Sequence, residues 1–345
     1  MKRIAFHDRE RETDEIMKIL DAEPSLITFI YGPINSGKTT LISHLIKELP
    51  EDYAPFYVNL RGRFITDYED FLNVLFEIDE EGGVDNVAEY AKSILKDLGA
   101  ISGIPIPINL FERIFEKKDK SKDVFKYIEQ FFVEISKTRT PILIVDELQV
   151  IGDLKIDGLL IYKLFNFFIR LTKELHLAHI FVITSDSLFI ERVYSEAMLE
   201  GRCRYLLVDD FDNSTTINFL DKYKFSDTEK EVAWNYCGGK PACLVELINA
   251  RENRKRKAEE MLKIRKGQIE EIVYSLEVKD KKMFAAVVGV FSEFRVKEKT
   301  GYKYLSDEIK FLVGKNIIFA DSANKELRPQ SRLNLLAIRE AMENM

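Results

Sequence analysis

Short, almost wholly apolar runs alternate along the chain with longer segments in which apolar residues recur every three or four positions. The short runs predict buried strands, and the longer segments predict amphipathic helices. Because the runs are apolar on both faces and helices separate them, they indicate a parallel sheet covered on both sides, which is an α/β fold. The five expected strands are residues 25–31, 54–60, 141–145, 179–184 and 205–208.

Three helices are expected in the long crossover between the second and third strands, at residues 67–78, 84–98 and 121–138. Residues 99–110, GAISGIPIPINL, separate the last two of these. Their prolines exclude a helix and predict a stiff extended loop. The crossover is too long for one helix, so it must contain an inserted helical element.

After the fifth strand the pattern is helical over residues 212–250, with a break at residues 237–241 (CGGKP). A charged helix is expected at residues 251–277. A length of 345 residues predicts two or three domains in total.

The last part of the chain, from about residue 280, predicts a small helical module. Residues 317–319 and 326–329 suggest a β-hairpin with its turn at residues 321–324. A final helix is expected at residues 331–343.

Charge is distributed unevenly along the chain. The net charge is −7, but residues 251–345 carry 21 Lys and Arg against 15 Asp and Glu. This C-terminal part is therefore the plausible place for a polyanionic partner, although a solvated helix surface would give the same pattern. No apolar stretch is long enough to span a bilayer, and no secretory signal is visible. Three cysteines make no disulfide framework, so we expect a cytoplasmic protein without membrane contact.

Residues 31–40, YGPINSGKTT, follow the first expected strand and precede a helical pattern. Gly32, Gly37, Lys38 and Thr39 fit G-x-x-x-x-G-K-[ST] without a mismatch. A glycine loop between a strand and a helix aims backbone N–H groups at one point and so stabilises a phosphate. Lys38 would reach the β- and γ-phosphates, and the Thr39 hydroxyl would ligate Mg²⁺. The alternative is a plain turn between strand and helix.

The third strand ends in Asp146 and Glu147. A carboxylate at the end of an apolar strand can lie beside Mg²⁺, which is the role expected of Asp146. Glu147 can polarise a water for in-line attack on the γ-phosphate, which favours hydrolysis over transfer to a small molecule. The alternative is an ordinary strand end with solvated acids.

Two further sets of residues are weaker candidates. Thr184 and Ser185 end the fourth strand, where a hydroxyl could sense the γ-phosphate or hold the attacking water. Arg202, just before the fifth strand, could supply positive charge to the phosphate of a neighbouring subunit. A surface arginine is the simpler interpretation of Arg202.

On these motifs the chain resembles the archaeal P-loop ATPases of the STAND/AAA+ group, relatives of the origin-recognition ATPases. The resemblance rests on FHDRERE near the start, GPINSGKT, LIVDELQ, TSDS, GRCR, CGGKP and LRPQSRLNLLAIRE, in family order over nearly the whole chain. It implies an ATPase base with strand order 5-1-4-3-2, a helical lid and a C-terminal winged helix. The implied domains are residues 1–210, 211–277 and 278–345.

The resemblance also implies which residues hold ATP or ADP. The segment from Phe6 to Glu10 would wall the adenine, and Gly239 and Pro241 of the lid would close over the base and ribose. No lid arginine takes the second-sensor position, where Lys240 is the nearest cation. The expected nucleotide-binding residues are Phe6, Arg9, Gly32, Pro33, Asn35, Ser36, Gly37, Lys38, Thr39, Thr40, Gly239 and Pro241.

The sequence thus predicts an ATP-hydrolysing switch whose nucleotide state positions the winged helix on double-stranded DNA, through residues 280–345, or on a protein partner. Residues 307–313 would read the groove, Lys303 and Lys310 would share a helix face, and Arg328 and Arg332 would flank the wing. The alternatives are a slow signalling scaffold that forms homo-oligomers on binding ATP and, more remotely, a small-molecule P-loop kinase.

Overall fold

A parallel six-stranded sheet forms the centre of the computed structural model. The structure describes residues 6–80, 86–95, 101–116, 120–151, 160–196 and 199–343, together with Ile4 and Leu154. In spatial order the strands are β8 (Cys203–Leu207), β1 (Ile27–Tyr31), β7 (His179–Thr184), β6 (Thr140–Asp146), β2 (Tyr53–Asn59) and β4 (Ile101–Ser102). Every neighbouring pair is parallel. Counted over the five expected strands, the order is 5-1-4-3-2, as predicted, and β4 adds a short edge strand.

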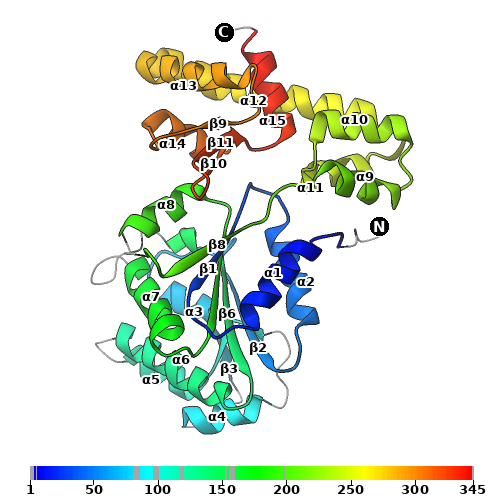
Figure 1. Cartoon of the computed structure of the whole chain (residues 1–345). Coiled ribbons are helices and arrows are strands. Elements are labelled where there is room, and N and C mark those ends of the chain that lie inside the picture. The colour runs from blue at the N-terminus through cyan, green and yellow to red at the C-terminus, as the bar shows by residue number, and fades with distance from the viewer. Residues whose placement is uncertain are drawn as a thin grey trace.

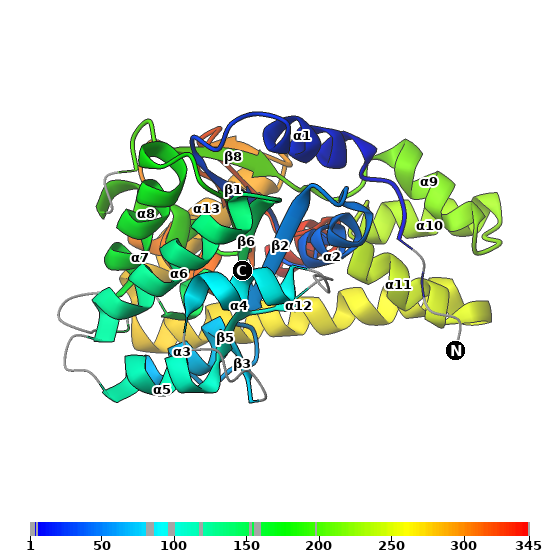
Figure 2. The same ribbon diagram turned by 90° about the horizontal axis from the view of Figure 1, so that it is seen from below.

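Alternate residues of each strand face two separate apolar cores, which explains why the strands are apolar throughout. One core packs α1 (Glu10–Leu20) and α2 (Lys38–Glu48) on one face of the sheet. The other core packs α3 (Tyr68–Leu75), α6 (Lys120–Ser136), α7 (Leu160–Ile169) and α8 (Ser187–Glu196) on the opposite face. Figure 2 shows α1 and α2 on one side of the strands and α6 and α7 on the other.

The inserted segment between β2 and β6 differs from the prediction in two places. The helix expected at residues 67–78 ends at Leu75, and β3 (Phe76–Asp79) follows it. Residues 101–110 form β4, β5 (Ile104–Pro107) and the start of α5 (Ile108–Glu116) rather than a loop. Among the described residues strand β5 pairs only with β3, and such an edge strand tolerates the missing N–H groups of its two prolines. The helix expected at residues 84–98 is α4 (Val87–Ile94), and residues 84–85 and 96–100 lie outside the described ranges.

Three helices form the lid that follows β8: α9 (Asn213–Asp221), α10 (Asp227–Cys237) and α11 (Pro241–Asn249). Ser226 and Glu229 form a capping box at the start of α10, and Pro241 occupies the first turn of α11. The lid has its own apolar core, which includes Phe219 and Leu244.

The C-terminal part, which we call the C-terminal module, packs around a further core. Its elements are α12 (Arg254–Lys279), α13 (Lys281–Phe294), β9 (Thr300–Gly301), α14 (Asp307–Gly314), β10 (Ile318–Asp321), β11 (Glu326–Pro329) and α15 (Arg332–Ala341). The strands form an antiparallel sheet in the order β10-β11-β9, and the predicted hairpin is present. Lys303 precedes α14, so the expectation that it shares a helix face with Lys310 is wrong.

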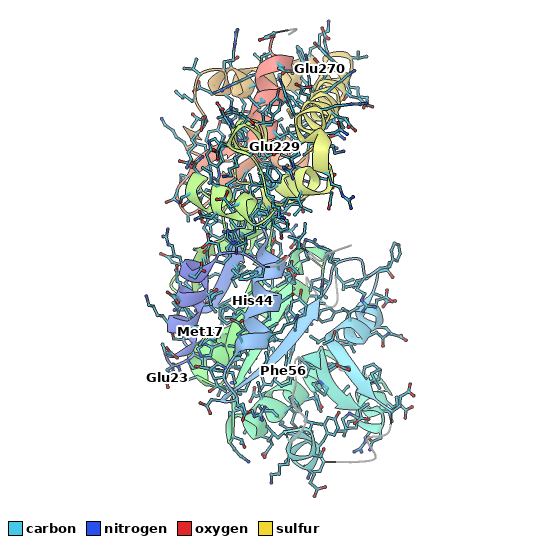
Figure 3. The ribbon with its side chains drawn as sticks, turned by 90° about the vertical axis from the view of Figure 1, so that its right-hand side faces the viewer. Met17, Glu23, His44, Phe56, Glu229 and Glu270 are labelled. Carbon is cyan, nitrogen blue, oxygen red and sulfur yellow. The ribbon has the colours of Figure 1, made fainter. Side chains whose placement is uncertain are left out.

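Lid and C-terminal module both lie at the carboxyl end of the central sheet (Figure 1). In the side view of Figure 3, Phe56 and His44 lie in the base, and Glu229 of the lid and Glu270 of α12 lie above it. Helix α14 and strand β10 contact α8 of the base. Within the described ranges, no helix has the length and apolar character needed to cross a bilayer.

Candidate nucleotide-binding site

The glycine loop leaves β1 at Tyr31 and enters α2 at Lys38, as the sequence predicted. Gly32 adopts a φ of 154°, and a Cβ there would lie 2.2 Å from the Val208 carbonyl oxygen. Gly37 has a φ of 96°, in the left-handed region that favours glycine. Both glycines are therefore required by the shape of the loop, which places the N-terminus of α2 beside it.

Lys38 is buried in the loop that precedes it. Its Nζ donates to the carbonyl oxygens of Gly32 (3.1 Å) and Pro33 (2.8 Å). Burial, assisted by the charge of Lys240, lowers the pKa of Lys38 to about 8, against the opposing effect of nearby carboxylates. A phosphate placed on the loop would favour the charged ammonium, so this group is suited to bind an anion.

Asp146 and Thr39 lie together at the carboxyl end of the sheet. Thr39 Oγ1 donates to Asp146 Oδ2 (2.9 Å), and the Tyr57 hydroxyl donates to the same oxygen (2.8 Å). Burial raises the pKa of Asp146, and the other carboxylate oxygen, Oδ1, is buried without a hydrogen-bond partner among the described residues. An unsatisfied carboxylate oxygen beside a threonine hydroxyl fits a hard divalent cation that keeps most of its water ligands, such as Mg²⁺.

Glu147 is held by side chains from three strand ends. Arg61, in the loop after β2, pairs with Glu147 Oε1, and Gln149 Nε2 donates to Oε2 (2.5 Å). Ser185 Oγ donates to Oε1 at 3.4 Å. Thr184 Oγ1 donates to Gln149 Oε1 at 2.9 Å, so both predicted sensor residues belong to this network.

An apolar cavity of about 230 Å³ opens beside the loop. It lies between the N-terminal segment, the start of α2 and the lid, and its walls are Ile4, Phe6, His7, Arg9, Ser36, Gly37, Thr40, Phe211, Phe219, Pro241 and Val245. Phe6 stacks on His44 of α2, with ring centroids 3.9 Å apart. A largely apolar cavity next to a phosphate loop suits a nucleobase.

Arg9 anchors the loop to the segment that follows β8. Its Nη2 donates to the carbonyl oxygens of Ser36 and Asp209, both at 2.7 Å, and its guanidinium lies 4.6 Å from the centroid of the Phe211 ring. Arg9 therefore fixes the position of the loop in addition to lining the cavity.

The lid contacts the loop through residues 239–241. A Cβ on Gly239 would lie 1.7 Å from the Phe211 carbonyl oxygen, so only glycine fits there. Lys240 Nζ pairs with Asp210 (2.8 Å) and donates to the Ile34 carbonyl oxygen (3.0 Å). The cation at the base of the lid is thus a lysine held against the phosphate loop.

Strand β11 and the residue after it reach the same loop. The Ile34 N–H donates to Gln330 Oε1 (3.1 Å), while Gln330 Nε2 donates to the Ile318 carbonyl oxygen (3.1 Å). Arg328 pairs with Asp209 at 2.6 Å. The Tyr31 hydroxyl at the end of β1 donates to Asp321 Oδ1 at 2.9 Å. The C-terminal module is therefore docked directly on the candidate site.

Arg202 is separated from this site. Its carbonyl oxygen accepts from the Ile27 N–H at the amino end of β1, about 16 Å along the strand from the loop. It does not contribute to the site of its own chain, so its predicted action on a neighbouring subunit stays a prediction. Asn35 is exposed at the tip of the loop, with a φ of 60°.

Sequence reasoning missed several residues that the fold brings to the site: Tyr57, Arg61, Gln149, Phe211, Phe219 and Gln330. Tyr57 and Arg61 had a usable signal, because the carboxyl end of the second strand had to lie beside that of the third in the predicted order. Gln330 had none, because its contact with Ile34 spans 296 residues.

A glycine loop on a central strand, a carboxylate pair at the end of β6 and this strand order define the P-loop class of ATPases. Residues 6–247 match the family described as an ATPase domain predominantly from Archaea, and residues 255–342 match the C-terminal domain of uncharacterized MJ1010-like ATP-binding proteins. The chain belongs to this family of archaeal ATP-binding proteins.

Relatives in two archaea are similar over their whole length. The uncharacterized ATP-binding protein PYRAB09480 of Pyrococcus abyssi is 50% identical over 339 residues, 98% of this chain and 99% of that protein. Its counterpart MJ1659 of Methanocaldococcus jannaschii is 48% identical over 354 residues, 99% and 98% of the two chains. Among solved structures, the Walker-type ATPase PABY2304 of Pyrococcus abyssi aligns with a TM-score of 0.60 at 17% identity, covering 98% of this chain and 97% of that one. This last likeness concerns the fold alone.

Proposed function

We propose that the protein is an ATP-hydrolysing switch, in which the nucleotide in the glycine loop controls whether the C-terminal module stays docked. In this proposal Lys38 and the loop N–H groups bind the β- and γ-phosphates. Thr39 and Asp146 would hold Mg²⁺, which neutralises phosphate charge when bound. Glu147 orients and deprotonates the attacking water once it is free of Arg61.

The hydrogen bond from the Ile34 N–H to Gln330 carries this proposal. Ile34 belongs to the phosphate loop, and a backbone donor already used by Gln330 cannot donate to a phosphate. The Ile34 carbonyl oxygen likewise accepts a hydrogen bond from Lys240 Nζ of the lid. Both backbone polar groups of Ile34 are therefore bonded to the module or the lid, and a rearrangement of the loop around a triphosphate would weaken the docking of both.

The Arg61–Glu147 pair favours the slow-turnover version of this function, and with it the alternative of a scaffold that oligomerises on ATP. A candidate base that already accepts hydrogen bonds from a guanidinium and from Gln149 is hindered from accepting a proton from water. The oligomeric state of the protein, measured with ADP and then with a slowly hydrolysed ATP analogue, distinguishes the switch from the scaffold. A discrete oligomer only with the analogue would support the scaffold, and a monomer in both states would support the switch.

Double-stranded DNA remains the proposed partner of the C-terminal module, which we take to be a winged helix. The basic residues that serve it differ from those first expected, because Arg328 pairs with Asp209 and Arg332 pairs with Glu298. The exposed cations around α14 are Lys303, Lys310 and Lys315. Cytoplasmic location and the domain bounds at residues 210 and 277 also remain part of the proposal.

The DNA proposal is tested by binding to duplex DNA at several salt concentrations. Phosphate contacts release counterions, so log affinity should fall linearly with log salt, with a slope of about −0.9 per phosphate neutralised. Replacing Lys303, Lys310 and Lys315 together by Ala should flatten the slope. Replacing Lys279, Lys281 and Lys282, three exposed lysines where α12 ends and α13 begins, provides a charge-matched control. An unchanged slope in the triple variant would contradict DNA binding by this face and favour a protein partner instead.

A further inference from the structure

Helix α13 is more apolar than its packing within the chain requires. Its buried face consists of Val287, Phe291 and Phe294, which belong to the core of the C-terminal module. Phe284 and Val290 lie on either side of this face and are only partly covered. A helix that is apolar on nearly all sides is normally buried on all sides. The outward face of α13 therefore indicates a contact that the described residues do not supply.

This outward face is small in its middle and apolar at its two ends. Ala285 and Gly289 are exposed, and a Cβ on Gly289 would meet nothing within 4 Å. Val278, shortly before α13, and Val296, shortly after it, are 89% and 87% exposed. Figure 1 shows α13 on the side of the C-terminal module that faces away from the base, so the base of the same chain does not cover this face.

Opposite charges mark the two ends of α13. Lys281 and Lys282 begin the helix, Glu293 lies one residue before its end, and all three are exposed. Cations at a helix N-terminus are unfavourable for the macrodipole, so α13 alone does not explain the two lysines. Glu293 pairs with Lys297 at 2.9 Å, but such an exposed pair contributes little. A helix with this charge pattern complements a second copy that runs antiparallel to it.

We propose that two copies of the chain dimerise by antiparallel packing of their α13 helices around a two-fold axis. Lys281 lies four residues before Ala285, and Glu293 lies four residues after Gly289. When Ala285 faces Gly289 of the second copy, Lys281 therefore lies opposite Glu293 of the second copy, and the two-fold axis repeats both contacts. The small side chains in the middle let the two helix axes approach closely.

The same register accounts for the two exposed valines. Val278 lies seven residues before Ala285, and Val296 lies seven residues after Gly289, so each end of the helix pair brings one valine from each copy together. These are the most exposed large apolar side chains of the described C-terminal module. Their burial in the dimer removes apolar surface from water, which favours association.

This interface is expected to be weak and independent of nucleotide. Helix α13 has 14 residues and is about 21 Å long, so one helix pair buries an area at the low end of specific interfaces. We expect a dissociation constant in the range of roughly 1–100 μM. Because α13 faces away from the base, the dimer should form equally with ADP and with a slowly hydrolysed ATP analogue.

Sedimentation equilibrium of the full-length protein, from about 1 to 300 μM, tests this proposal. The wild type should pass from monomer to dimer, with the same dissociation constant in ADP and in the analogue. Gly289→Arg should raise that constant by roughly tenfold or more, because the new side chain separates the two helices. Gly267→Arg on α12, where a Cβ likewise meets nothing within 4 Å, is the matched control and should dimerise as the wild type. Thermal unfolding should show that both variants fold.

A charge exchange tests the register. Lys281→Glu and Glu293→Lys should each weaken the dimer, because each places like charges opposite one another, and the double variant should restore it. A wild type that stays monomeric at every concentration, or a dimer that Gly289→Arg leaves intact, would overturn the proposed interface. A double variant no stronger than the single ones would overturn the antiparallel register.

The outcome for this interface is separate from the outcome for the switch. Gly289→Arg provides a monomeric protein with an unaltered nucleotide site, and an oligomer that forms in this variant only with the ATP analogue would support the scaffold. A dimer of the wild type that is equal in ADP and in the analogue supports the α13 interface. A dimer that requires the analogue would contradict an interface independent of nucleotide.

Discussion

At the scale of single residues, the candidate site brings buried cations and carboxylates together. Lys38 and Lys240 each lie more than nine-tenths buried within the same group of loop carbonyls, and Asp146 and Glu147 are buried opposite them. Buried charges are costly unless they are paired or hydrogen-bonded. Lys240 and Glu147 each have an oppositely charged partner, whereas Lys38 is held by loop carbonyl oxygens and Asp146 by two hydroxyl groups. Single substitutions here should therefore have separable effects on binding and on turnover.

Lys38→Ala should weaken ATP binding by roughly a hundredfold or more, because it removes the charge that faces two phosphates. Titration calorimetry at fixed Mg²⁺ measures this, with Lys47→Ala on the exposed end of α2 as the charge-matched control. Unchanged ATP affinity in Lys38→Ala would reject the phosphate-loop interpretation.

Replacing Glu147 by Gln keeps the shape of the side chain but removes the base. ATP should still bind, while the rate constant of hydrolysis, measured under single-turnover conditions, should fall by roughly a hundredfold. Glu48→Gln, on an exposed helix end, should be unaffected. Intact hydrolysis in Glu147→Gln would mean that another residue activates the water.

Arg61→Ala should release Glu147 from its ion pair. We expect turnover to rise by up to about fivefold, because a partly exposed ion pair is worth at most about 1 kcal/mol, which corresponds to about that factor in rate. Arg63→Ala, two residues along the same loop, serves as the control. A fall in turnover in Arg61→Ala would show that Arg61 assists catalysis instead of restraining the base.

The lowered pKa of Lys38 predicts a pH dependence of binding. In the free protein Lys38 loses its proton as the pH rises through about 8, whereas a bound phosphate keeps it charged. ADP affinity should therefore be constant below this pH and fall above it, with proton uptake on binding. Calorimetry at pH 9 in buffers of different ionisation enthalpy should detect that uptake, and Lys38→Arg should abolish it. A wild-type affinity that does not change between pH 7 and 9 would contradict the assignment.

At the scale of elements, the sequence predicted the five main strands and the phosphate loop, because each depends on local periodicity or spacing, whereas the order of the strands was implied by the resemblance to the archaeal ATPases. It failed at β3 and β5, since a strand that follows a helix without a turn residue and a strand with two prolines both lack the usual signals. It also assigned Arg328 to a DNA face, although that side chain pairs with Asp209, 119 residues away. Long-range pairings of this kind have no trace in local sequence.

Gly239→Ala tests the close contact between the lid loop and the segment after β8. The added Cβ would collide with the Phe211 backbone, so the lid loop must shift. We expect a loss of about 1–3 kcal/mol in the free energy of unfolding and faster ADP release. Gly267→Ala on α12, where nothing lies within 4 Å, should instead stabilise by up to about 1 kcal/mol. Equal stability in both variants would refute the tight packing.

At the scale of the whole molecule, the C-terminal module is joined to the base by contacts at the phosphate loop, at Tyr31 and at α8. Lys325 adds an ion pair with Glu191 of α8 at 2.8 Å. This docking surface also contains apolar contacts, because Phe319 of β10 packs in the apolar core of the base and Leu188 of α8 packs against the core of the module. The excess positive charge of the module is partly neutralised by the acidic base, and undocking would free Arg328 for a polyanion.

Hydrogen exchange of residues 318–330 is the measurement that tests the switch most directly. It is followed in the nucleotide-free protein, with ADP, and with a slowly hydrolysed ATP analogue at saturation. We predict faster exchange of β10, β11 and the facing α8 with the analogue. Gln330→Ala should exchange fast in every state, and Gln268→Ala on the exposed face of α12 should behave as the wild type. Identical exchange in all three states, with nucleotide bound, would contradict the coupling between the phosphate loop and the C-terminal module.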